Sequence, residues 1–249
     1  MKESALRSAL PHVVAVLVFT VLSFAYFYPV LEGKKINAHD TKVFTGSSKE
    51  IFDYREEFES EPLWTNSMFG GMPAFLISAK FPGNLIKHLD NLLRLYKTPV
   101  AALFLSMLGF YILLLLLRVN PWLAVAGAIA YGFTTFLFVS LSAGHNTKVY
   151  AMAYMAPVVG SAVYAFRSDA FRGAALFALF LSLEIMANHL QITYYTFLIL
   201  LVFGIYEFYP RNSPIRTDVN IDPVCYLNHS LRLLNAELDV NRVYIFIVC

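Results

Sequence analysis

The sequence predicts an all-α integral membrane protein that folds as a multi-span helical bundle. Hydrophobic residues make up 58% of the 249-residue chain and charged residues 14%, whereas soluble domains average about 45–50% and about 25%. Several apolar runs approach the roughly 20 residues that a spanning helix needs, and a helix satisfies its own backbone hydrogen bonds inside a bilayer. The net charge of +2 is too small to suggest a nucleic-acid partner, so the expected partner is the lipid bilayer.

Six apolar runs are the predicted membrane spans of a domain that covers residues 1–208. The first follows Lys2 and Arg7 and resembles a signal peptide, but its apolar run is long and no small-residue cleavage site follows it. We therefore expect an uncleaved span there, while the fifth run is short for a span. The six runs are residues 12–31, 98–117, 122–141, 150–166, 173–187 and 190–208.

Basic residues near the span ends predict the orientation, because Lys and Arg accumulate in short cytoplasmic connections. Arginines such as Arg118 and Arg167 occur in the connections on one side, whereas the short connections on the other side contain only Lys148. The long first connection, residues 32–97, balances acids against bases and gives no preference. The N-terminus is therefore predicted to be cytoplasmic, and residues 32–97 to be an outer loop.

Two amphipathic helices are expected within this outer loop. Residues 47–60 place apolar side chains among charges, as a helix at a membrane surface does, and Ser47 or Ser48 can cap its start. Residues 84–96 repeat the pattern. Between them, residues 62–75 contain a Gly-Gly pair and two prolines, which predict a structured turn rather than a strand or helix.

The last segment, residues 209–249, differs from the rest of the chain. It is polar and irregular and neither spans nor forms an evident domain. A cytoplasmic tail is one interpretation, and a truncated or frame-shifted gene end is the one we favour. Both cysteines, Cys225 and Cys249, lie in this segment and cannot form a disulfide framework.

Polar side chains gather in the three connections that the topology places on the outer side. They are His39 and Asp40 after the first span, His145, Asn146 and Lys148 between the third and fourth, and Glu184, Asn188, His189 and Gln191 around the fifth-to-sixth connection. The inner connections offer only the orienting arginines. Any chemistry is therefore expected on the outer side.

Each of these residues also has a structural interpretation. On spacing alone Asp40 fits an ordinary loop acid or helix cap better than a catalytic group. His145 and Asn146 fit a turn, where Asn often serves backbone geometry, and Lys148 fits a snorkelling side chain. Glu184 is the strongest single candidate, because an ionisable group within a span is costly and functional by default, although a position near the interface would solvate it.

Together these groups predict chemistry on a lipid-borne phosphate. A carboxylate such as Asp40 can act as general base on an acceptor hydroxyl, and Lys148 with the histidines can hold a phosphate. The alternative is a divalent-metal site made by His39, Asp40, His145 and His189. No histidine pair at helical i, i+4 spacing supports that alternative, so the cofactor is left open.

Four blocks of the sequence resemble the YfhO-type bacterial membrane proteins, in their Bacteroidetes form. They are "FYPVLEGKKINAHDT", "EPLWTNSMFGGMPAF", "SAGHNTKVYAMAYMAPVV" and "ANHLQITYY", and the resemblance covers roughly residues 1–208. That family is placed with the GT-C glycosyltransferases, multi-span enzymes that use lipid-phosphate-linked sugars. Its members are longer, so the resemblance covers only their N-terminal part.

The resemblance implies a GT-C-like transmembrane fold in the bacterial inner membrane. It implies transfer of a sugar from a polyprenyl-phosphate donor on the extracytoplasmic face to a cell-envelope acceptor. Asp40 matches the acidic residue that the family carries near the end of the first span, so the resemblance implies that it is the catalytic base. A transporter or flippase of lipid-linked sugars, or a non-catalytic membrane fragment, is the alternative.

Overall fold

The structure is a computed structural model that describes residues 2–78, 80, 83–94 and 96–208; the predicted polar tail, residues 209–249, lies outside the described residues. The described part is mainly helical. It also contains one hairpin of two strands, each two residues long, and two short 3-10 helices. Its helices are α1 (Lys2–Tyr26), α2 (His39–Phe58), α3 (Leu85–Leu93), α4 (Val100–Leu116), α5 (Pro121–Gly132), α6 (Thr135–Ala143), α7 (Asn146–Arg167), α8 (Ala170–Met186) and α9 (Leu190–Phe208); the shorter elements are η1 (Tyr28–Val30), β1 (Trp64–Thr65), β2 (Met72–Pro73) and η2 (Ala74–Leu76).

The helical membrane character is confirmed, but fewer than six helices of the described chain pass a length and hydropathy test for a span. Three do so: residues 9–26 of α1, then α7 and α9. The α5–α6 pair makes a fourth if it counts as one bent span. The apolar α4 and the helix α8 have only 17 residues each, fewer than the roughly 20 that cross a bilayer without tilt or thinning.

The predicted span at 122–141 coincides with two helices rather than one, because the chain breaks between α5 and α6 and bends there by 43°. Thr134 has an extended backbone, with ψ of 139°. Gly132 ends α5 directly against α4, since a Cβ added to it would lie 2.4 Å from Cγ of Met107. The bend therefore lies at the point where the end of α5 packs against α4. The first predicted span also ends early, at Tyr26, before Pro29 in η1.

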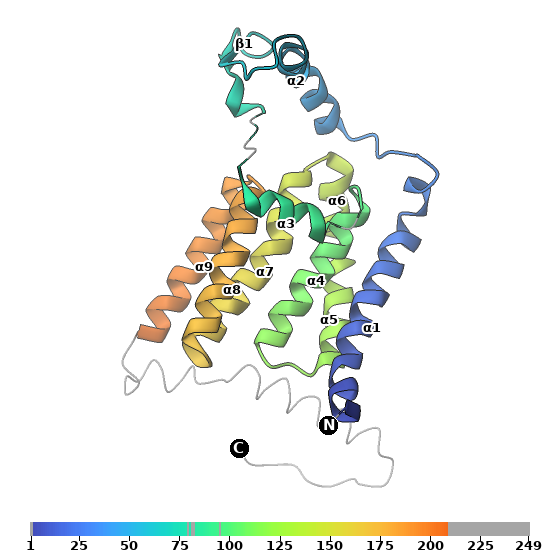
Figure 1. The fold of residues 1–249 in the computed structure, drawn as a ribbon, viewed down its shortest axis with the longest axis vertical. Coiled ribbons are helices and arrows are strands. Elements are labelled where there is room, and N and C mark those ends of the chain that lie inside the picture. The colour runs from blue at the N-terminus through green and yellow to red at the C-terminus, as the bar shows by residue number, and fades with distance from the viewer. Residues whose placement is uncertain (1, 79, 81–82, 95, 209–249) are drawn as a thin grey trace.

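The bundle has two distinct ends (Figure 1). The N-terminus lies at one end, while α3 lies across the opposite end and α2 stands beyond it with β1. The turn between α6 and α7 and the turn between α8 and α9 also lie at the α3 end. The alternation of the helices therefore brings the three predicted outer connections to one end of the bundle.

The outer loop is more ordered than the sequence predicts. Helix α2 begins at His39, eight residues before the predicted start at 47, and its N-cap Ala38 makes no side-chain hydrogen bond. Ser48 does not cap the helix, because its hydroxyl donates to the Phe44 carbonyl at 2.6 Å. The predicted turn at 62–75 contains an antiparallel hairpin in which Thr65 faces Met72. We call residues 39–78, α2 with this hairpin and η2, the cap.

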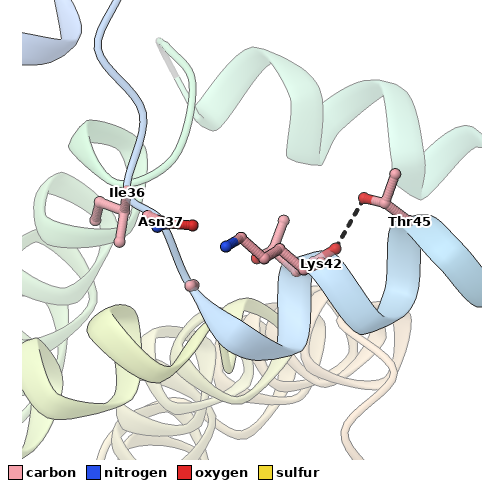
Figure 2. Close-up of a pocket in the computed structure, with 6 residues that line it drawn as sticks. Ile36, Asn37, Lys42 and Thr45 are labelled. Carbon is pink, nitrogen blue, oxygen red and sulfur yellow. Dashed lines mark hydrogen bonds between the residues drawn. The ribbon is translucent and has the colours of Figure 1, made fainter.

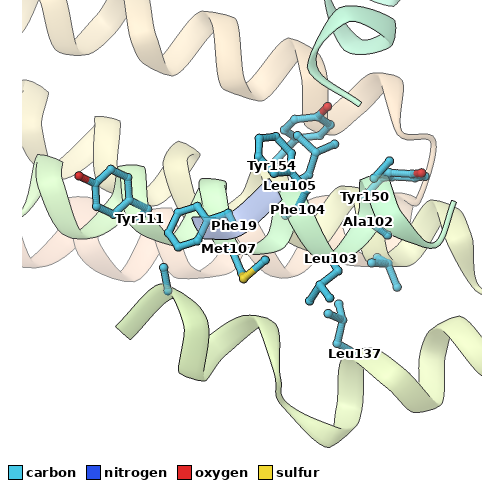
Figure 3. Packing of buried hydrophobic residues seen from close by; sticks show 14 of the residues in the cluster. Phe19, Ala102, Leu103, Phe104, Leu105, Met107, Tyr111, Leu137, Tyr150 and Tyr154 are labelled. Carbon is cyan, nitrogen blue, oxygen red and sulfur yellow. The ribbon is translucent and has the colours of Figure 1, made fainter. Parts of the chain in front are cut away.

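The core lies where α4 crosses α7 and α1 (Figure 3). Phe19 of α1 meets the ring of Tyr111 of α4 edge-on, with the ring centroids 5.7 Å apart. Between α4 and α7 the approach is closer still, because a Cβ added to Gly109 would lie 2.0 Å from the carbonyl oxygen of Ala153. Helix backbones approach this closely only where a small residue faces the partner helix.

Candidate functional site

Asp40 and His145 meet at the α3 end of the bundle. The first turn of α2 lies against the turn between α6 and α7, and Nε2 of His145 lies 2.7 Å from Oδ2 of Asp40. Both side chains are nearly half exposed, at 45% and 47%. A carboxylate beside an imidazole and open to solvent is an arrangement that can take up a proton. The two predicted outer connections therefore form one polar dyad.

Glycine is required at position 144 for this contact. Its φ of +98° is in the left-handed region, and an added Cβ would lie 3.0 Å from Cβ of Ala38 and 3.1 Å from the backbone nitrogen of Thr41. Any side chain at this position would strain the turn and push α2 away. Gly144 thus sets the distance between Asp40 and His145.

The third predicted outer connection reaches the start of α7 through His189. The hydroxyl of Thr147 lies 3.4 Å from Nδ1 of His189, a long contact. Burial lowers the pKa of His189, and the positive charges of Lys148 and His145 lower it further. Within the described residues, the buried Nε2 of His189 has no hydrogen-bond partner. His189 is therefore a neutral imidazole beside the dyad.

Lys148 does not contact Asp40. Its Nζ lies 4.7 Å from the centroid of the Phe136 ring, a cation–π contact. Its charge still reaches His189, as the lowered pKa of that histidine shows. Lys148 thus adds positive charge to the bundle end that holds the dyad.

The remaining candidates of the three connections make contacts outside the dyad. Asn188 is exposed and its φ of +56° serves the turn between α8 and α9. Gln191 donates to the hydroxyl of Tyr195, one turn along α9, at 2.9 Å. Asn146 starts α7, and its backbone N–H donates to the Gly144 carbonyl. His39 is exposed and forms no hydrogen bond within the described part of the chain.

Glu184 lies inside the bundle rather than at a solvated interface. Its side chain is fully buried, and its Oε1 accepts a hydrogen bond of 2.6 Å from the Thr196 hydroxyl of α9. The second oxygen, Oε2, has no partner among the described residues. Glu184 is therefore separated from the solvent that the dyad contacts.

No group of three or more His, Cys, Asp or Glu side chains that could hold a metal ion is found in the described residues. Asp40 and His145 form a pair, and His39 contributes no contact to it. Of the four ligands in the predicted metal site, the described residues bring only Asp40 and His145 into contact.

A shallow pocket of about 240 Å³ opens at the start of α2 (Figure 2). Ala38 and Thr41 line it together with Ile36, Asn37, Lys42 and Thr45. Figure 2 shows the side chains of Asn37 and Lys42 directed toward one another across it. Asp40 does not line this pocket, so it is a separate hollow beside the dyad.

A buried polar cluster attaches α3 to α7, and the sequence analysis missed it. The Tyr154 hydroxyl donates to Asp90 at 2.7 Å, and Arg94 pairs with the same carboxylate at 2.7 Å. The Arg94 guanidinium lies 3.8 Å from the centroid of the Tyr150 ring, and Tyr150 shares a hydrogen bond with Thr98. The available signal was Asp90 itself, an acid on the apolar face of a predicted amphipathic helix.

Acid should destabilise the protein through His189. Because its pKa is lowered in the folded state, only the unfolded state takes up this proton below the usual histidine pKa of about 6.5. Stability is complete above that pH and falls as the pH drops below it. We expect the fall in melting temperature from about pH 7.5 to about pH 5.5 to be smaller in His189→Gln than in the unchanged protein. An identical fall in both would contradict this role of His189.

Comparison of the chain with protein-family models, with curated proteins and with solved structures finds no match in any of the three.

Proposed function

We propose that this protein is a GT-C-type membrane glycosyltransferase that moves a sugar from a polyprenyl-phosphate donor to a cell-envelope acceptor. The reaction would take place at the α3 end of the bundle, on the extracytoplasmic face of a bacterial inner membrane. The observation that supports this best is the 2.7 Å contact between His145 and the half-exposed Asp40. It would provide a positioned, solvent-accessible base for the acceptor.

The proposed reaction needs one base and one cationic group. Asp40 takes the proton from the acceptor hydroxyl, and the acceptor oxygen forms a bond to the anomeric carbon of the sugar. The bond between that carbon and the phosphate oxygen breaks, and its electron pair leaves with the polyprenyl phosphate. Lys148, with His145 and His189, stabilises the departing charge, while His39, a residue away from Asp40, belongs to the acceptor side.

Six spans are part of the proposal. The three candidate spans α1, α7 and α9 would be joined by the bent α5–α6 pair and by the two 17-residue helices, α4 and α8. The alternating direction of the helices in Figure 1 supports this number, and the distribution of Lys and Arg supports a cytoplasmic N-terminus.

A transporter of lipid-linked sugars is the second candidate. Such proteins use broken helices and buried ionisable groups, and the 43° break between α5 and α6 together with the buried Glu184 fits that description. The accessible dyad at the bundle end favours the transferase. Movement of labelled donor across a vesicle membrane without release of polyprenyl phosphate would reverse this order.

The test is a transfer assay in liposomes with a polyprenyl-phosphate-linked radiolabelled sugar and an envelope fraction of the source organism as acceptor. We expect release of polyprenyl phosphate together with labelled envelope material. Replacing His145 with alanine removes the 2.7 Å contact that positions Asp40 and should slow release about tenfold, less than the roughly 10²–10⁴-fold that a positioned base contributes as a whole. His88→Ala is the matched control, because His88 is exposed on α3. Equal rates in the unchanged protein and His145→Ala would contradict the role of the dyad.

A further inference from the structure

The cap contains a second, larger cleft between α2 and the end of β1. Its volume is about 610 Å³. The α2 side carries Glu50, Asp53, Tyr54, Glu57 and Phe58 in successive turns, and Asn66 lies on the opposite side. The cleft stands away from the bundle, because the cap lies beyond the end that α3 covers (Figure 1).

Hydrogen bonds hold the two sides of the cleft in place. The Oε2 atom of Glu50 accepts from the Thr65 hydroxyl and, at 2.8 Å, from the backbone N–H of Asn66. One turn earlier, the Ser67 hydroxyl donates to the Ser47 carbonyl at 2.6 Å. The cleft is thus preformed, and the side-chain amide of Asn66 makes no hydrogen bond to the described residues.

An aromatic surface forms part of the cleft. The rings of Tyr54 and Phe58 lie with their centroids 4.6 Å apart, inclined by 37°, and the two residues are 38% and 55% exposed. Large aromatic faces in water are costly, and they contribute strongly to binding when a ligand covers them. Aromatic faces beside carboxylates and an amide suit a ligand with an apolar C–H face and a ring of hydroxyl groups.

The charge of the cleft restricts the ligand further. Its side chains include the three acids Glu50, Asp53 and Glu57, and one base, Lys49, which is paired with Asp53. Hydrogen bonds from Thr65 and from the Asn66 N–H lower the pKa of Glu50, so it stays ionised at neutral pH. Within the described residues Glu57 has no partner. A net negative cleft repels polyanions.

The cleft and the dyad lie along the same helix, α2. Gly46, at its near end, is six residues from Asp40, or about 9 Å at 1.5 Å per residue. His39 lies seven residues before Gly46, so it is on the same face of α2. A ligand that extends past Gly46 along this face would therefore reach His39 in the first turn of α2, next to Asp40.

We propose that this cleft binds an uncharged oligosaccharide, which the cap presents to Asp40 as the acceptor. The role of this oligosaccharide as acceptor rests on the proposed transferase function, but its binding in the cleft does not depend on transfer. Tyr54 and Phe58 would cover the sugar C–H face, while Glu57, Glu50 Oε1 and Asn66 would bond to its hydroxyls.

Binding is tested with the full chain in lipid nanodiscs, because sugar-headed detergents would compete for the cleft. The probes are cellohexaose, chitohexaose and maltohexaose as uncharged hexamers, with hexagalacturonate as the acidic counterpart and hexalysine as a basic peptide. Saturation-transfer NMR and calorimetry report the affinities. We expect at least one uncharged hexamer to bind about tenfold more tightly than hexagalacturonate.

Variants locate the binding. Phe58→Ala should weaken the uncharged hexamer about tenfold, as expected for an aromatic contact at the centre of a binding surface. Phe44→Ala is the matched control, because Phe44 is an exposed aromatic of α2 that does not line the cleft. Asp40→Asn should bind the hexamer as the unchanged protein does even if transfer is lost.

Three results would overturn the inference: no binding of any uncharged hexamer, equal weakening by Phe58→Ala and Phe44→Ala, or salt-sensitive binding of hexalysine in preference to the sugars. If the hexamer binds at the cleft but no transfer occurs in any assay, the inference stands and the transferase proposal fails. If transfer occurs without binding at the cleft, the reverse holds.

Discussion

Replacing Asp40 with asparagine should abolish sugar transfer and leave the fold intact. The amide keeps the size of the side chain, so the asparagine can occupy the same place beside His145 Nε2, which lies 2.7 Å from Asp40 in the unchanged protein. It cannot take a proton from the acceptor. A positioned general base contributes about 10²–10⁴-fold to a rate, and we expect release of polyprenyl phosphate to fall by that factor.

The control for this variant is Glu32→Gln. Glu32 is an exposed acid of the same outer loop, paired with Lys34 at 2.6 Å and remote from the dyad in its contacts. Both variants should keep the melting temperature of the unchanged protein. Near-normal transfer by Asp40→Asn would disprove the base role, and loss of transfer by both variants would mean that outer-loop charge, not Asp40, is required.

Gly109→Val should strongly destabilise the bundle. The first added atom would lie 2.0 Å from the backbone carbonyl oxygen of Ala153, and no side-chain rotation relieves a contact with backbone. Helices α4 and α7 would have to separate along their interface. Over-packing usually costs about 1–3 kcal/mol, and we expect Gly109→Val to reach or exceed the upper end.

Gly204→Val is the matched control. Gly204 lies in α9, also in a helix, and an added Cβ there meets nothing within 4 Å. Thermal unfolding in nanodiscs should show a large drop for Gly109→Val and only a small helix-propensity effect for Gly204→Val. Similar melting temperatures for the two variants would mean that α4 and α7 do not pack as described.

The positions of the helices were largely predictable because apolar composition determines them locally. The boundaries were not, since they depend on tertiary contacts. The break before Thr134 follows from the fit of Gly132 against Met107 of another helix. The early start of α2 coincides with the contact between Ala38 and Gly144, more than one hundred residues away in the chain. No local capping signal marks that start.

The grouping of the candidate residues was partly predictable in the same way. Alternating spans predict which connections share an end, and Asp40 and His145 do meet there. Glu184 differs because its burial depends on Thr196 of the next helix, a partner that no motif indicates. The Asp90 cluster depends on the facing tyrosines of α7, which look like ordinary span residues in the sequence.

The attachment of the outer loop has a mechanical consequence. Its first end rests on Gly144 and His145, and its last end is held by Tyr150 and Tyr154 through Arg94 and Asp90. Both supports thus belong to the first turns of one helix and the turn before it. A tilt of α7 would therefore move both attachments of the loop at once.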